Sequence, residues 1–243
     1  MHLPNLLIAG AQKSGTTWLH VALSQSKQVF GSKRKELNYF NKGQLGDIDT
    51  YRSNFPDKRG VKYYFESTPH YFRAIKGKVD IAERVSKTIP DAKIIVVLRD
   101  PVARYESAYI HHMMRGRFPY EPIIDNFSED FGLIRLGQYA KNLTHWQKKM
   151  PDIGVFLYDD LLEDKVIFVD SIMSYLEIEN DIRPEKLEFR RNDKSKKIKR
   201  AGWDQMPKMS PELRQKLYEY FQSDIDDLEV MIDRDLGAWR FDS

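Results

Sequence analysis

A glycine-framed loop near the N-terminus is the feature that most restricts what this chain can fold into. The apolar, β-prone run Leu6–Ala9 leads into residues 10–17, Gly-Ala-Gln-Lys-Ser-Gly-Thr-Thr, and a helical pattern continues over Thr16–Ser26. A glycine-rich turn between a strand and a helix presents backbone N–H groups and a helix N-terminus to phosphate oxygens. The sequence therefore predicts an α/β fold that binds an anion at the end of its first strand.

Further apolar runs alternate with helical patterns along the chain. Short apolar or β-prone runs predict three more strands: Val61–Phe65, Lys93–Leu98 and Gly154–Tyr158. Helices are predicted between and after them, two of them with a Pro start signal: Val79–Thr88, Val102–Met114, Leu136–Met150, Lys165–Leu176 and Glu212–Phe221. This alternation predicts a doubly wound α/β fold, a central parallel sheet with helices on both faces, in one domain over residues 1–243.

Composition narrows the classes of function. The chain has 243 residues, a net charge of +3 and no cysteine. The small positive excess suits an anionic ligand and does not indicate a nucleic-acid-binding protein, and the absence of thiols excludes disulfides, thiolate catalysis and cysteine zinc sites. The apolar stretch from Leu6 to Ala11 is too short to span a bilayer. We expect a cytoplasmic protein without a membrane or nucleic-acid partner, or a catalytic domain separated from its anchor.

The loop departs from the ATP-binding Walker pattern, GxxxxGK followed by Ser or Thr. Gly10 and Gly15 have the required spacing and Thr17 fills the hydroxyl position, but Thr16 stands where the lysine belongs. The lysine of this loop is Lys13, three residues earlier. A P-loop kinase or NTPase with a displaced lysine is therefore one alternative, and a plain glycine turn is another.

Residues 12–18, Gln-Lys-Ser-Gly-Thr-Thr-Trp, resemble the 5′-phosphosulfate loop of sulfotransferases that use 3′-phosphoadenosine 5′-phosphosulfate (PAPS). The resemblance implies that Lys13 contacts the bridging and sulfuryl oxygens of PAPS. It also implies that hydroxyl and amide groups of the following residues hold the 5′-phosphate: Ser14, Gly15, Thr16 and Thr17. Trp18 stands where an aromatic residue helps to hold the adenine in some members of that family.

A second segment resembles the same family. The predicted strand Lys93–Leu98 ends in Arg99, and Ser107 lies eight positions further on. A charge at the C-terminal end of a buried parallel strand usually faces the ligand crevice of an open α/β sheet, and arginine grips phosphate with two hydrogen bonds. Without the first loop, the favoured interpretation is that Arg99 is a surface ion-pair partner of Asp100 and Ser107 an ordinary helix residue. Together with the loop, Arg99 and Ser107 resemble the 3′-phosphate site of PAPS sulfotransferases.

The basic segment of residues 194–203, Lys-Ser-Lys-Lys-Ile-Lys-Arg-Ala-Gly-Trp, is either a solvated surface or a lid. Related enzymes close a late, basic, glycine-containing loop over the phosphates of the cofactor. That resemblance implies cofactor contacts for Lys199 and Arg200, although the family's usual order of Lys, Arg and Gly is not reproduced.

The acceptor side of such an enzyme needs a base. Residues 33–41, Lys-Arg-Lys-Glu-Leu-Asn-Tyr-Phe-Asn, resemble the Lys-Glu-x-x-Phe/Tyr-Phe motif of heparan-type glycosaminoglycan sulfotransferases. The resemblance implies that Glu36 is the general base and that Lys35 lies beside it in the site. A single Glu among lysines is otherwise most simply a surface carboxylate.

Residues 65–72, Phe-Glu-Ser-Thr-Pro-His-Tyr-Phe, resemble the Glu-Lys-Ser/Thr-x-x-Tyr segment that lines the site in the same group. Ser67 replaces the family's lysine, which lies near the transferred sulfuryl group. Lys35 or His70 would compensate for the missing charge. His70 also competes with Glu36 for the role of base.

These observations predict a PAPS-dependent sulfotransferase, closest to the heparan/glycosaminoglycan branch that includes N-deacetylase/N-sulfotransferases and 3-O-sulfotransferases. It would transfer a sulfuryl group by in-line displacement to a hydroxyl or amine of a sugar or small natural product. No metal is expected, because Lys13 and Arg99 would neutralise the phosphates. The acceptor, O- versus N-sulfation and the oligomeric state stay open. The alternatives are a Mg²⁺-dependent kinase or NTPase and a non-catalytic nucleotide-binding module.

Overall fold

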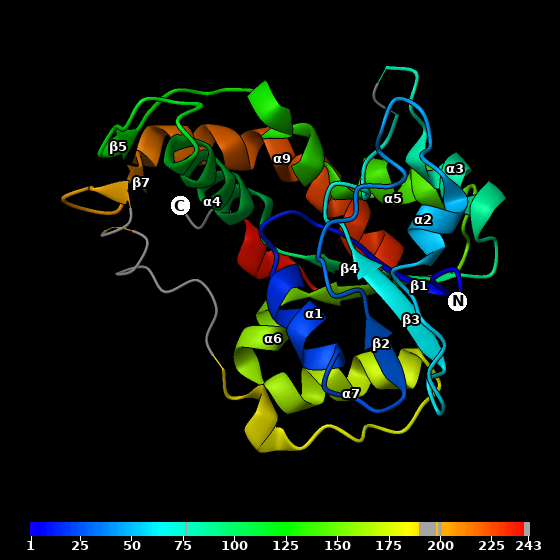
Figure 1. Cartoon of the computed structure of the whole chain (residues 1–243). Coiled ribbons are helices and arrows are strands. Elements are labelled where there is room, and N and C mark those ends of the chain that lie inside the picture. The colour runs from blue at the N-terminus through cyan, green and yellow to red at the C-terminus, as the bar shows by residue number, and fades with distance from the viewer. Residues whose placement is uncertain (76, 190–197, 199–200, 241–243) are drawn as a thin grey trace. The chain divides into compact units, whose positions relative to one another are not determined.

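A computed structural model describes residues 1–75, 77–189, 198 and 201–240 of the chain (Figure 1). The chain forms two compact units, and the single domain expected over the whole chain stays a prediction. The first unit comprises residues 1–98 and 142–189, and the second comprises residues 99–141 and 190–243. The glycine-framed loop belongs to the first unit, whereas Arg99 and Ser107 belong to the second.

The first unit is built on a five-stranded sheet in which all neighbouring strands are parallel, as the sequence predicts. The strand order is β2-β3-β1-β4-β6, with bounds Val29–Gly31, Tyr63–Ser67, Leu6–Gly10, Lys93–Leu98 and Ile153–Leu157. Every residue of β1 is buried, which is the pattern of a strand covered on both faces.

Helices cover both faces of this sheet. In Figure 1, α1 (Thr16–Leu23) and α7 (Lys165–Tyr175) lie on one face and α3 (Ile81–Thr88) lies on the other. Three further helical segments of this unit are short: α2 (Ile48–Arg52), α6 (Tyr158–Glu163) and the 3-10 turn Pro184–Leu187.

The face under α1 and α7 holds an apolar cluster. Leu6 and Ile8 of β1 contribute to it from the sheet, Leu19 from α1 and Ile172 from α7, and all four are fully buried. Burying each such side chain stabilises the fold by about 1.5–3 kcal/mol. This packing anchors the N-terminal part of α1, where the loop ends.

The strand order fixes where the loop lies. β1 lies between β3 and β4, with β2 and β3 on one side of it and β4 and β6 on the other. The strand order therefore changes direction at β1. Open α/β sheets bind ligands beyond the carboxyl ends of their strands at such a point. The loop of residues 10–17 follows β1 directly, so the fold places it at the expected ligand position.

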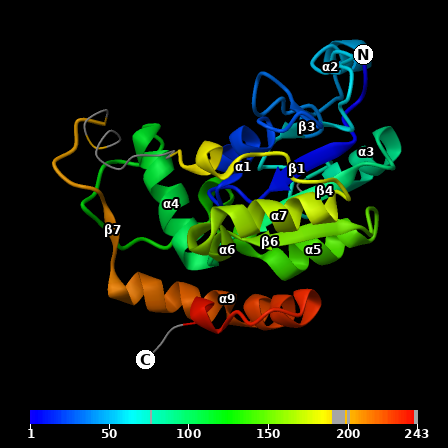
Figure 2. The same cartoon turned by 90° about the horizontal axis from the view of Figure 1, so that it is seen from below.

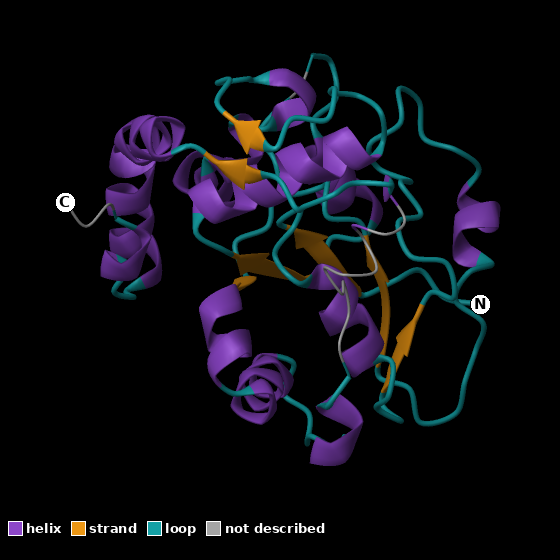
Figure 3. Ribbon diagram, turned by 90° about the vertical axis from the view of Figure 1, so that its left-hand side faces the viewer, coloured by secondary structure: helices purple, strands orange, loops and turns teal. Residues whose placement is uncertain are grey.

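The second unit contains α4 (Pro101–Met114) and α9 (Pro211–Ile232), an unbroken helix of 22 residues (Figure 2). Its two short strands, β5 (Ile123–Ile124) and β7 (Lys208–Met209), pair in parallel (Figure 3). Helix α5 (Tyr139–Gln147) begins in the second unit and continues into the first. The second unit also contains three 3-10 turns: Asp130–Gly132, Arg135–Gly137 and Gly237–Trp239.

The predicted helix starts are confirmed. Asp100 accepts a hydrogen bond from the Val102 amide with Pro101 in the first turn, and Ser210 caps α9 through the Leu213 amide. Some boundaries differ from the prediction: Tyr158 opens α6 instead of ending a strand, and α9 continues eleven residues past Phe221. Within the described ranges, no helix combines the length and the apolar character needed to cross a bilayer.

Candidate functional site

The loop of residues 10–17 is held against the sheet by its backbone. The Ala11 amide donates to the Val97 carbonyl of β4 at 2.8 Å, and the Leu19 amide donates to the Gly15 carbonyl at 3.0 Å. Lys13 has a φ of 72°, in the left-handed region that few residues other than glycine adopt. The loop is therefore a tight, defined turn between β1 and α1.

Gly15 is a loop position where only glycine fits. Its φ is 83°, and a Cβ built there would lie 2.9 Å from the Tyr158 ring and 3.1 Å from Leu161. Gly15 is also the N-cap residue of α1, where it has no side chain to bond the first amides of the helix. These N–H groups and the positive end of the helix dipole suit an anionic oxygen.

Ser14 provides a second sign of an anion site. Its side chain is 0% exposed, and its Oγ has no hydrogen-bond partner among the residues that the structure describes. A buried hydroxyl without a partner costs roughly 1–3 kcal/mol. Lys13 is half-buried, Thr16 is buried and Thr17 is exposed. The loop thus combines a cation, hydroxyls and amides, which is the donor set that a phosphate or sulfate group requires.

Trp18 is turned into the core. It is 8% exposed, stacks on Phe189 with ring centroids 5.3 Å apart and meets Phe168 edge-on at 6.3 Å. These contacts fix the first turn of α1. The contact of Trp18 with an adenine ring stays a prediction.

Glu36 lies in a loop beside the end of β3. Its amide donates to the Ser67 carbonyl at 3.0 Å, and its Oε1 accepts a hydrogen bond of 2.9 Å from Lys35 Nζ. The Glu36 side chain is 47% exposed, whereas that of Lys35 is 18% exposed. Lys35 and Glu36 therefore form an ion pair, with the carboxylate open to solvent.

His20 was not among the predicted site residues. Its Nδ1 lies 2.8 Å from Ser67 Oγ, at the position where the resembled family carries a lysine. Burial, with a smaller contribution from the charge of Lys35, lowers the pKa of His20 to about 4. His20 is thus neutral at neutral pH, and Lys35 supplies positive charge near Ser67. No linear motif signals this contact, because it forms where α1 packs against β3, far along the chain.

His70 joins the glycine-framed loop to a cavity. Gln12 Nε2 and His70 Nε2 lie 3.3 Å apart. His70 also lines a cavity of about 650 Å³, together with residues Asn41, Lys42, Arg73, Gly77 and Val79. This cavity borders the loop through the contact of His70 with Gln12. Among the described residues, its lining includes the cations Lys42 and Arg73 and no carboxylate.

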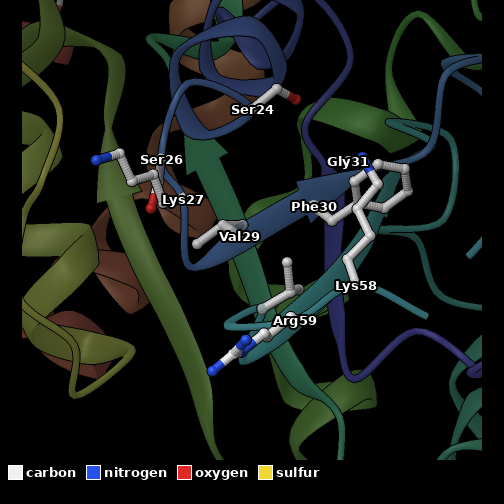
Figure 4. A pocket seen from close by; sticks show the side chains of 9 residues that line it. Ser24, Ser26, Lys27, Val29, Phe30, Gly31, Lys58 and Arg59 are labelled. Atoms are coloured by element: carbon white, nitrogen blue, oxygen red, sulfur yellow. The ribbon is translucent and has the colours of Figure 1, made fainter. Parts of the chain in front are cut away.

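A second basic cavity lies on the β2 side of the first unit (Figure 4). It has a volume of about 410 Å³ and is lined by Lys27, Lys58 and Arg59 with apolar and hydroxyl side chains. Lys58 Nζ already lies over the Phe30 ring, 4.2 Å from its centroid. None of the predicted site residues lines this cavity.

In the second unit, Arg99 follows β4 and Ser107 is a half-buried residue of α4. The Arg99 carbonyl accepts a hydrogen bond of 2.8 Å from the Tyr139 hydroxyl. The carboxylate of Asp100 binds the Val102 amide and the Tyr218 hydroxyl, which gives it a capping role.

Arg104 lies on α4, between Arg99 and Ser107 in the sequence, and is 0% exposed. Its Nη2 donates to the Leu133 carbonyl, whereas Nε and Nη1 have no hydrogen-bond partner within the described residues. Burial lowers the pKa of Arg104, and the charge of Arg99 lowers it further. The unsatisfied donors of Arg104 and its closeness to a second cation, Arg99, suit an anion in this unit.

Lys199 and Arg200 lie outside the described residues. Within the described part of the chain, no cluster of three or more His, Cys, Asp or Glu side chains could hold a metal ion.

The family model and the similar proteins reported below are all sulfotransferases. The sequence model described as the sulfotransferase domain matches residues 3–227. The bifunctional heparan sulfate N-deacetylase/N-sulfotransferase 1 of Caenorhabditis elegans is 30% identical over 162 residues, which cover 59% of this chain and 18% of that protein. The human heparan sulfate glucosamine 3-O-sulfotransferase 6 is 28% identical over 187 residues, or 71% of this chain and 52% of that protein.

Among solved structures, a sulfotransferase from Alicyclobacillus acidocaldarius superposes with a TM-score of 0.79 at 25% identity, covering 99% of this chain and 100% of that one. The two heparan sulfate enzymes are longer, and the chain spans about a fifth to a half of their length.

Proposed function

The chain belongs to the sulfotransferase family, a family of transferases, and we propose that it transfers a sulfuryl group from PAPS to a hydroxyl or amine of a sugar or small natural product. The observation that carries this proposal is the loop of residues 10–17. It brings the half-buried Lys13, the unpartnered hydroxyl of Ser14 and the glycine-capped start of α1 together at the end of the central strand.

On the donor side, the amides of Gly15, Thr16 and Thr17, with the hydroxyls of Ser14 and Thr17, would hold the 5′-phosphate. PAPS, when bound, supplies an activated sulfuryl group whose leaving group is a phosphate. Lys13 would face that leaving phosphate and stabilise the charge that develops on its bridging oxygen.

In the second unit, Arg99 and Ser107 would hold the 3′-phosphate. The neighbouring cation Arg104 supports this role, because two buried or half-buried guanidinium groups near one another favour an anion. Lys199 and Arg200 are proposed to contact the phosphates from the basic segment of residues 194–203.

On the acceptor side, Glu36 would take the proton from the acceptor as the new bond to sulfur forms. Lys35 holds Oε1 of this carboxylate at 2.9 Å, which fixes its orientation. The cavity beside His70 would receive the acceptor, since His70 contacts Gln12 of the loop. Its lining of Lys42, His70 and Arg73 favours an acceptor that carries a negative charge near the reacting group.

The experiment that tests this function is sulfuryl transfer with purified protein. Incubation with PAPS and a panel of amino sugars, uronate oligosaccharides and small alcohols should give products that gain 80 Da by mass spectrometry, in the presence of EDTA. A kinase or NTPase would instead need ATP and Mg²⁺ and would release phosphate.

A thermal-shift measurement separates the same alternatives without any acceptor. 3′-Phosphoadenosine 5′-phosphate (PAP) at a hundred times its Kd should stabilise the protein by about 2.7 kcal/mol, and ATP with Mg²⁺ should stabilise it much less. Stronger stabilisation by ATP·Mg²⁺ than by PAP would contradict the proposal.

A further inference from the structure

We infer that Glu66 is a positioning residue for the reaction: its buried carboxylate is the centre of a hydroxyl network that fixes the loop of residues 36–40 and thereby the orientation of Glu36. The inference rests on the proposed function in so far as it assigns Glu36 the role of base. The network itself is a property of the first unit.

Three hydroxyl groups converge on Glu66, which is 0% exposed. Its Oε1 accepts hydrogen bonds from Tyr51 at 2.7 Å and from Tyr71 at 2.9 Å, and its Oε2 accepts one from Thr68 at 2.6 Å. Tyr51 comes from α2, whereas Thr68 and Tyr71 follow β3. The carboxylate therefore ties together segments that the sequence separates by as many as twenty residues.

The same hydroxyls also hold the backbone of the loop that carries Glu36. The Phe40 amide donates to the Tyr71 hydroxyl at 3.2 Å, and the Asn38 amide lies 3.4 Å from the Thr68 hydroxyl. Each of these hydroxyls donates its proton to Glu66 and accepts from the loop, so the orientation of each is set by the carboxylate. A hydrogen bond from the Leu37 backbone to Glu66 itself adds to this set.

The loop needs such support because its backbone is strained. Glu36 has a φ of 63° and Asn38 a φ of 57°, both in the left-handed region. Residues other than glycine persist there only when the surrounding structure over-determines them. The amides of residues 37, 38 and 40 reach Glu66 directly or through one hydroxyl, and the Glu36 amide bonds the adjacent Ser67 carbonyl.

The electrostatics of the network agree with this geometry. Burial raises the pKa of Glu66, while the hydrogen bonds from Thr68, Tyr51 and Tyr71 lower it. Burial raises the pKa of both tyrosines, with Glu66 adding to the effect, so both stay protonated donors. A buried carboxylate costs several kcal/mol unless its oxygens are bonded, and here each oxygen accepts at least one short hydrogen bond.

Two variants test the inference. Glu66→Gln keeps the size of the side chain but converts one acceptor oxygen into a donor, so it cannot accept all three hydroxyls. Tyr71→Phe keeps Glu66 and removes the hydroxyl that links it to Phe40. Tyr64→Phe is the matched control, because the Tyr64 hydroxyl bonds Lys58 and lies outside this network.

The first readout is amide hydrogen exchange, which needs no catalysis. In Glu66→Gln and Tyr71→Phe the segment of residues 36–40 should exchange at least tenfold faster, while residues 16–23 of α1 keep the wild-type rate. Unchanged protection of residues 36–40 in both folded variants would overturn the inference, whatever reaction the protein catalyses.

The second readout is a double-mutant cycle in kcat. Glu66→Gln should lower kcat by about 10–100-fold, the effect of a misplaced catalytic group, with the KM for PAPS within about twofold of wild type. In the Glu36→Gln background, Glu66→Gln should lower kcat by less than about threefold, because the effects of residues that act together are not additive. If the fold-losses in kcat of the two single variants multiply in the double variant, Glu66 acts only through the stability of the protein and not through Glu36.

The outcomes distinguish the two proposals. If the wild-type protein transfers no sulfuryl group, the proposed function fails while the exchange experiment still decides the role of Glu66. If the wild type is active, Glu36→Gln is slow and Glu66→Gln turns over normally, the inference about Glu66 fails and the proposed function stands.

Discussion

His20 of α1 and Ser67 at the end of β3 are joined by a hydrogen bond of 2.8 Å in the buried interior of the first unit. Ser67 Oγ lies against Nδ1 of the ring, the imidazole also forms a hydrogen bond with the Ser32 backbone, and Phe65 packs edge-on at a centroid distance of 4.9 Å. Desolvation of the ring and the nearby charge of Lys35 both disfavour the imidazolium form.

Acid should therefore destabilise the protein through His20. The folded-state pKa is about 4, and the unfolded value is about 6.5. Between these pH values the unfolded chain binds a proton at His20 and the folded chain does not, so the free energy of unfolding falls as the pH falls from about 6.5 to about 4. The loss from this group amounts to roughly 3 kcal/mol.

Urea unfolding of wild type and His20→Gln at pH 7.5 and pH 4.5 measures this effect. Subtracting the two proteins removes the contributions of other groups, including Glu66, whose pKa burial raises. The difference between the proteins should shrink or change sign at the lower pH. A difference that does not depend on pH would mean that His20 titrates normally in the folded state.

Gly15→Ala should destabilise the protein by about 2–4 kcal/mol, because the new Cβ adds a steric clash to a left-handed φ. Gly60→Ala is a matched control: Gly60 has the same φ of 83°, but a Cβ there meets nothing within 4 Å. Gly60→Ala should cost only about 1–2 kcal/mol. Equal losses in thermal unfolding would show that Tyr158 and Leu161 move aside at no cost.

The parts of the fold that the sequence predicts well are those with a local cause. β4 has the predicted bounds, and α4 begins one residue before the predicted start, because an apolar run and an Asp-Pro cap act within a few residues of each other. β2 has only three residues and forms by pairing with β3, so no periodic pattern signals it. Long-range pairing also accounts for the contact between His20 and Ser67.

The same distinction applies to the site. The loop around Lys13 and the segment of Lys35 and Glu36 are each contiguous in sequence. The structure shows the expected turn, and it places Lys35 beside Glu36 in an ion pair. The Glu66 network depends on α2, which the sequence pattern did not predict, and on the burial of a carboxylate, which composition cannot show. The catalytic and cofactor roles of all these residues stay predictions.

Lys13→Ala should lower kcat by about 10²–10³-fold, the usual cost of losing one donor to the charge of a transition state. Affinity for PAP should fall much less, because the amides of the loop and the start of α1 still hold the 5′-phosphate. Steady-state kinetics and calorimetry with PAP measure the two effects separately. Lys87→Ala, which removes an exposed lysine paired with Glu83, is the control and should behave as wild type.

Arg99→Ala should act in the opposite way. A 3′-phosphate lies far from the reacting sulfur, so Arg99 would contribute binding that is common to ground and transition states. The KM for PAPS should rise by about 10–100-fold, the worth of a charge-assisted pair, at nearly unchanged kcat. Arg99→Lys should recover part of the affinity. A mutant that still binds PAP as tightly as wild type would remove the 3′-phosphate role.

The identity of the base can be decided from pH dependence and two substitutions. A carboxylate titrates near pH 4.3 in its ordinary range and a histidine near 6.5, so a Glu36 base predicts activity that is lost only on the acid side, below about pH 5. Glu36→Gln keeps the size of the side chain and removes its basicity. It should lower kcat by roughly 10²–10⁴-fold, the usual contribution of a positioned base, while the thermal shift with PAP stays as in wild type.

His70→Gln should have a smaller effect on kcat and a larger one on the KM of the acceptor, because His70 lines the cavity where the acceptor would bind and contacts Gln12 of the loop. The acid limb of the pH profile should keep its position in this variant. If instead His70→Gln is inactive and Glu36→Gln turns over normally, histidine is the base. The resemblance of residues 33–41 to the heparan-type motif would then be structural, while the donor-side assignments to Lys13 and Arg99 would still hold, because they depend on different residues and different measurements.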